Sequence, residues 1–62
     1  MSAAYAVYEK TPAGLTFHMG PWPHADFTLQ KAREFSDRYR KPFVAVDEQT
    51  MTVLPDEGRE AA

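Results

Sequence analysis

Residues 28–41 are the one stretch of this 62-residue chain with a clear helical repeat, and short strand-like runs lie on both sides of it. Leu29, Ala32, Phe35 and Tyr39 recur at spacings of three and four, which places them along one side of a helix. A chain of this length forms one domain at most. Since a single helix can cover only one face of a sheet, the other face needs a separate explanation.

Alternating apolar and polar residues predict strands at 3–9 and 15–19, joined by a turn that contains proline and glycine. Two further strands are expected at 43–47 and 51–54. The sequence therefore predicts an α+β fold of order ββαββ, in which an antiparallel sheet of about four short strands carries one helix on one face. We expect residues 1–55 to form this domain and the acidic segment 56–62 to be a flexible tail.

The ends of the helix follow from local signals. Thr28 is the expected N-cap, with Asp26 as a competitor, and either choice places an acidic group near the positive end of the helix dipole. Pro42 is expected to end the helix after Lys41. The Gly-Pro-Trp-Pro-His segment at 20–24 is expected to break the strand before it.

The two faces of the sheet can be assigned by assuming that the helix covers the more apolar set of each strand. This assumption predicts a core of Val7, Leu15, Phe17, Leu29, Ala32, Phe35, Tyr39, Val44, Val46, Met51 and Val53. It leaves Ala4, Ala6, Tyr8, Thr16, His18, Phe43, Ala45, Thr52 and Leu54 on the uncovered face. A one-residue change of register exchanges the faces of a strand, and the first strand in particular could be inverted.

An uncovered face with aromatic and aliphatic residues is typical of a docking surface for a protein or for a second copy of the chain. Surface apolar residues without a partner are also common. The expected contact residues are Tyr8, His18, Phe43 and Leu54, with Trp22 at the rim. Trp22 lies between two prolines, which suits either a rigid interface anchor or a plug over one end of the core.

The charge is unevenly distributed. Residues 31–41 carry five basic and two acidic side chains, whereas the rest of the chain carries two basic and seven acidic ones. The basic set is Lys31, Arg33, Arg38, Arg40 and Lys41. This helix face could contact nucleic-acid phosphates. It could equally be a solvated face whose charges are balanced by the i,i+4 pairs Glu34–Arg38 and Asp37–Lys41.

Several classes of protein are disfavoured. The chain has no cysteine, so disulfides and thiolate metal sites are excluded, and a cytoplasmic location is expected. No apolar run is long enough to span a membrane. His18, His24 and Asp26 match no common metal-ligand spacing, and no nucleophile or phosphate-binding motif is present. We therefore expect no cofactor, no metal, no small-molecule substrate and no catalytic activity.

The sequence thus favours a small non-enzymatic protein-binding module, such as an adaptor, inhibitor or regulator of the phage or plasmid type, acting through the uncovered sheet face. Its partner would be another protein or a second copy of the chain. A domain of this size is weakly stable by itself, at about 3–5 kcal/mol, so covering an apolar face would stabilise it appreciably. The alternative is a nucleic-acid-associated regulator that uses the basic helix face.

Overall fold

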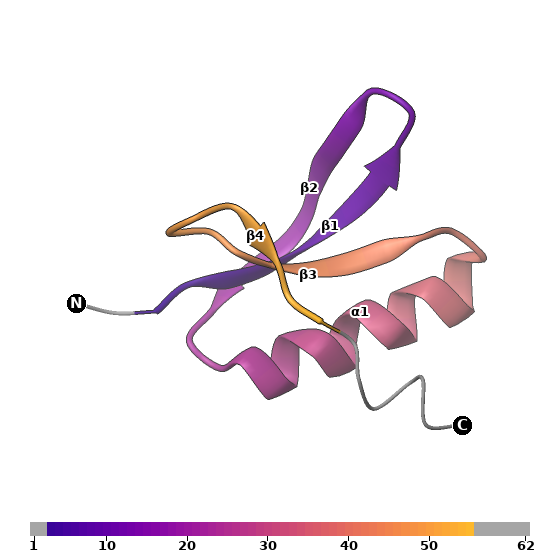
Figure 1. The fold of residues 1–62 in the computed structure, drawn as a ribbon. Helices are drawn as coiled ribbons and strands as arrows, with labels where there is room; N and C mark the ends of the chain where they lie inside the picture. Colours follow the sequence, from indigo (N-terminus) through magenta and orange to yellow (C-terminus); the bar gives the residue numbers. More distant parts are fainter. Residues whose placement is uncertain (1–2, 56–62) are drawn as a thin grey trace.

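A computed structural model describes residues 3–55. Its elements, in chain order, are β1 (Tyr5–Thr11), β2 (Gly14–Trp22), α1 (Ala25–Tyr39), β3 (Phe43–Asp47) and β4 (Thr52–Val53). This order confirms the predicted ββαββ arrangement (Figure 1). The predicted tail at 56–62 lies outside the described residues.

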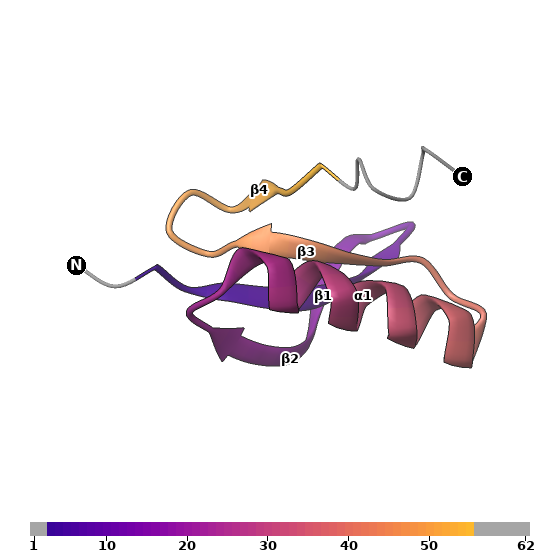
Figure 2. The same cartoon turned by 90° about the horizontal axis from the view of Figure 1, so that it is seen from below.

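The four strands form one antiparallel sheet in the order β2-β1-β3-β4. Each hairpin contributes one central and one outer strand, and the pairing of β1 with β3 joins the two hairpins. Helix α1 packs on one face, mainly over β3 and β1, and touches β2 much less (Figure 2). The helix therefore leaves one whole face of the sheet, and most of β2, without cover.

The core lies between α1 and the two central strands. Val7, Phe43 and Ala45 point from the sheet toward the helix, and Ala32 meets them from α1. Two of these four residues are alanines, whose small side chains let the helix lie close to the sheet. Partly buried side chains surround this cluster: Trp22, Leu29, Phe35 and Leu54.

Helix α1 begins earlier than predicted. It starts at Ala25, with His24 as an N-cap in extended conformation that makes no side-chain capping bond. The N-cap prediction of Thr28 is therefore wrong. Thr28 lies in the first turn and is fully buried. Its hydroxyl tolerates this burial because it donates a hydrogen bond to the His24 carbonyl at 2.8 Å. Asp26 lies in the first turn, as the helix dipole favours.

The helix also ends before the predicted Lys41. Arg40 adopts a left-handed conformation, with φ 57° and ψ 41°, and its N–H donates to the Ser36 carbonyl at 2.9 Å. That geometry closes the last turn after Tyr39. The Ser36 hydroxyl then accepts a hydrogen bond from the Phe43 N–H at 3.0 Å, which fixes the start of β3 to the helix.

The prediction that the segment 20–24 breaks the second strand is wrong for its first three residues, because β2 continues through Gly20 and Pro21 to Trp22. The β1–β2 register shifts on both sides of Val7, and this irregular stretch takes in Gly20 and Pro21, joined by a cis peptide bond. An outer strand tolerates proline at such a position, because the missing N–H has no obligatory partner. A Cβ at Gly20 would lie 2.8 Å from the Ala6 Cβ, so only glycine allows this close approach.

Phe43→Ala should destabilise the domain severely. Phe43 is 8% exposed within the core, and deletion of a buried phenylalanine side chain lowers the free energy of unfolding by about 3–5 kcal/mol. That loss is comparable with the whole stability of a domain this small. Phe17→Ala, in the same sheet but at a side chain 50% exposed, should cost only about 1 kcal/mol. Urea unfolding followed by circular dichroism measures both, and equal losses would contradict this placement of Phe43.

Candidate functional site

The face of the sheet opposite α1 carries a band of apolar side chains. Strand pairing aligns Tyr8 with Phe17 on β2 and with Val44 on β3. The neighbouring rows pair Lys10 with Leu15, and Ala6 with Val46 and then Val53. We call this set the open face: Ala6, Tyr8, Lys10, Leu15, Phe17, Val44, Val46 and Val53.

The open face is buried at its centre and exposed toward both outer strands. Ala6 and Val46 are inaccessible to water. Leu15, Phe17 and Val53 are 37%, 50% and 44% exposed. Met19, in the irregular part of β2, is 44% exposed. A strand whose apolar residues alternate this regularly normally turns them toward a core, whereas Leu15 and Phe17 of β2 lie on the face opposite the helix and remain partly exposed.

One aromatic pair and one hydrogen bond order the open face. The rings of Tyr8 and Phe17 meet edge to face, with centroids 5.6 Å apart. The Tyr8 hydroxyl donates to the Glu48 Oε2 at 2.7 Å, which links β1 to the turn after β3. This bond to the carboxylate, together with desolvation and the nearby negative charge, raises the pKa of Tyr8 above its usual value of 10.0. The ring of Tyr8 is therefore held in one position on the face.

The structure separates the five residues predicted as contacts. Tyr8 lies on the open face, as predicted. Phe43 and Leu54 pack against the core beneath α1, so their predicted placement on the uncovered face is wrong. His18 also lies on the helix side, where its exposed ring packs at centroid distances of 4.9 Å from Phe35 and 4.8 Å from Phe43.

Trp22 lies on the helix side of the sheet, half-buried at the end of β2. Its ring packs against the core and meets Phe27 edge to face at 5.1 Å. Of the two predicted roles, this geometry is that of the plug over one end of the core. The proline-rich segment therefore places its tryptophan against the helix and not across the open face.

The wrong assignment of the two faces in β2, β3 and β4 has a specific origin. Residues 43–46 read Phe-Val-Ala-Val, which is apolar on both sides, so alternation gives no assignment for β3. The structure turns Phe43 toward Phe35 and Tyr39 and leaves Val44 and Val46 opposite the helix. Because Val53 on β4 pairs with Val46, it also lies on the face opposite the helix and not in the predicted core. In β2 the alternation is clear, but the apolar set faces away from α1, and no signal within the strand reveals this.

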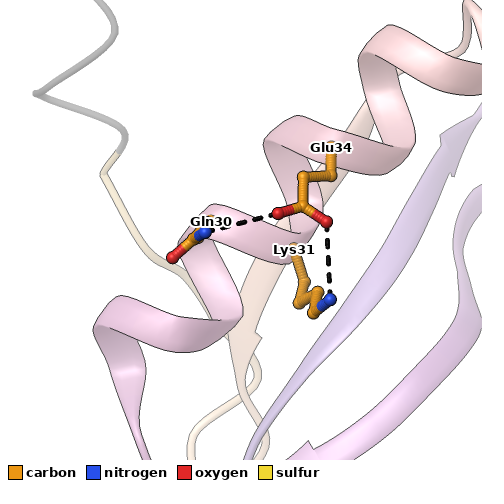
Figure 3. Close-up of polar contacts among 3 residues, drawn as sticks. All are labelled: Gln30, Lys31 and Glu34. Atoms are coloured by element: carbon orange, nitrogen blue, oxygen red, sulfur yellow. Dashed lines mark hydrogen bonds and ion pairs between the residues drawn. The ribbon is translucent and has the colours of Figure 1, made fainter.

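The basic residues of the helix region are not equivalent. Lys31 pairs with Glu34 at 3.4 Å, and Glu34 also accepts a hydrogen bond from Gln30 at 3.3 Å (Figure 3). The Lys31 ammonium lies 5.5 Å from the centroid of the Phe27 ring. Arg33 is half-buried and also engaged in an interaction. The remaining basic residues, Arg38, Arg40 and Lys41, are exposed around the C-terminal end of α1.

Within residues 3–55 no pocket is enclosed, and no three histidine or acidic side chains gather where they could hold a metal ion. None of the described helical structure has the length and apolar character needed to cross a bilayer. No protein-family model, curated protein or solved structure matches the chain.

Tyr8→Phe should remove a stabilising contribution that depends on pH. Because the folded-state pKa of Tyr8 is raised, its hydrogen bond contributes fully below pH 10 and is lost as the pH rises through that pKa. At neutral pH we expect the variant to be less stable by about 0.5–1 kcal/mol. Urea unfolding of both proteins from pH 7 to 11 should show this difference shrinking above pH 10. A difference that stays constant across the range would contradict the assigned hydrogen bond.

Proposed function

We propose that this chain is a small non-enzymatic protein-binding module, an adaptor, inhibitor or regulator, that acts through the open face. The observation that carries the proposal is the exposure of Leu15 and Phe17 on the side of the sheet without a helix. Together with Tyr8, Val44 and Val53 they form an apolar surface that crosses all four strands. Such a surface is typical of a protein-interaction site.

The energetics support a partner. Transfer of one such side chain from water into an interface contributes about 1.5–3 kcal/mol when burial is complete. Leu15, Phe17 and Val53 together would therefore contribute an amount comparable with the stability of a domain of this size. The gain is available only when another surface covers the open face.

The contact residues differ from those that the sequence suggested. Tyr8 remains a proposed contact, and its ring is fixed by Phe17 and Glu48. Leu15, Phe17, Val44 and Val53 join it. Phe43, Leu54, His18 and Trp22 instead support the fold from the helix side.

Phe17→Asp should weaken binding while the fold stays intact. Phe17 is half-exposed, so the variant should keep the wild-type circular-dichroism spectrum. The loss of its remaining burial, about 1 kcal/mol, and the cost of covering a carboxylate with an apolar surface should together weaken association by at least about fivefold. Ala13→Asp in the exposed hairpin loop is the matched control, because it adds the same charge off the open face. Pull-down with the tagged protein and light scattering report on a different partner and on self-association. If both variants behave like the wild type in both assays, the proposal fails.

The nucleic-acid alternative is supported by the exposure of Arg38, Arg40 and Lys41 near one another at the end of α1. It is the weaker proposal, because Lys31 and Arg33 are already engaged with other groups. The apolar open face also lies on the opposite side of the sheet from the helix, so bases stacked on it would be far from these charges.

Arg38→Ala combined with Lys41→Ala tests this alternative. If the helix end binds phosphates, a gel-shift titration at low salt should show a complex that weakens steeply as salt is added. The double variant should then bind more weakly with a shallower salt dependence, whereas Phe17→Asp should bind like the wild type. Absence of any complex at tens of micromolar protein would remove the nucleic-acid proposal.

A further inference from the structure

The outer edge of β2 is a second unpartnered feature, distinct from the open face. β2 is the outermost strand on one side of the sheet and pairs with β1 alone among the described strands. The opposite edge is β4, which comprises only Thr52–Val53 (Figure 2). The molecule therefore has one long strand edge and one short one.

The backbone groups that β2 turns outward can be identified. The Lys10 N–H donates to the Pro42 carbonyl at 2.8 Å, toward the β3 side of β1. In an antiparallel ladder, Leu15, which pairs with Lys10, then turns its own N–H and carbonyl away from β1. Phe17, two residues further along, does the same. Both residues thus offer backbone donors and acceptors at the free edge.

The regular part of this edge lacks the usual protection against strand pairing. Charged side chains, prolines and bulges normally prevent an outer strand from pairing with another chain. The nine residues of β2 include no lysine, arginine, aspartate or glutamate. Its proline and its irregular register lie in the C-terminal half, after Phe17. Residues 15–17 are left regular, uncharged and open.

We propose that two copies of this chain pair antiparallel through the β2 edge, about a two-fold axis at Thr16. This register places Leu15 of each copy opposite Phe17 of the other, so that the outward N–H and carbonyl groups meet. Thr16 then faces its own copy across the axis, and a threonine pair is favourable at such a position. The result is a continuous eight-stranded sheet with both helices on the same side.

Two features favour a second copy of the chain as the partner of the β2 edge. They are the absence of charge on this edge and the shortness of the opposite edge at β4. At the two-fold axis Thr16 meets its own copy, where a charged residue would repel itself, and β2 has no charged side chain there or at the neighbouring residues 15 and 17. A strand of another protein would find no charge there to select it. Since the edge at β4 is only two residues long, pairing through β2 ends at the dimer and does not continue into a fibre.

The dimer does not depend on the proposed function. Edge pairing joins the two open faces side by side and covers neither of them. The surface available to a partner becomes twice as wide, and Leu15 of one copy lies beside Phe17 of the other at its centre.

Variants that place a positive or a negative charge at residue 16 test the proposal. Light scattering over a concentration series should show a dimer for the wild type. Thr16→Lys and Thr16→Asp should each raise the dimer Kd by roughly fivefold or more, because like charges meet at the axis. An equimolar mixture of the two should restore a dimer. Glu9 lies opposite Thr16 on β1, which favours folding of the lysine variant, and circular dichroism verifies that both variants fold.

Amide hydrogen exchange gives a second measurement that needs no variant. The Leu15 and Phe17 N–H groups should exchange fast when the protein is dilute and become protected as the dimer forms. A wild-type protein that stays monomeric to millimolar concentration, with both amides unprotected, would overturn the inference. So would a dimer that Thr16→Lys leaves intact and Val53→Asp dissociates, since that result means pairing through the open face and supports only the proposed function. Protection that arises only on addition of an unrelated extended peptide would also overturn it.

Discussion

The packing of α1 against β1 and β3 is the constraint on which the rest of the structure depends. Val7, Phe43 and Ala45 point toward the helix because its apolar side must be buried somewhere. One helix reaches only one face and mainly two strands, so β2 and the outer parts of the opposite face stay in contact with water. The exposed residues of β2 are a direct consequence of this coverage.

Strand β2 contributes to both proposed surfaces, but through different groups. Its side chains at Leu15 and Phe17 belong to the open face, whereas its outward backbone groups form the free edge. Edge pairing uses main-chain hydrogen bonds and leaves the side chains available, so both interactions can occur in one assembly. For a chain with no disulfide to strengthen it, association is a physical route to greater stability.

Sequence reasoning succeeded where the signal was local and failed where it depended on pairing. The element order, the bounds of β3 and the orientation of β1, with Val7 inward and Tyr8 outward, were predicted correctly. Phe43, Leu54 and His18 were placed on the wrong side of the sheet. Residues 43–46 are apolar on both sides, and a one-residue shift reverses every side chain of a strand. No local property of the chain distinguishes the two arrangements.

By itself the sequence determined that one helix and two hairpins would form, and that one face of their sheet would lack cover, because periodicity and turn residues act over short distances. Only the tertiary structure decided which face that is. The choice depends on the long-range pairing of β1 with β3 and on the packing of Phe43 among His18, Phe35 and Tyr39. These contacts join residues far apart in the chain, so their energies exist only once the sheet has assembled.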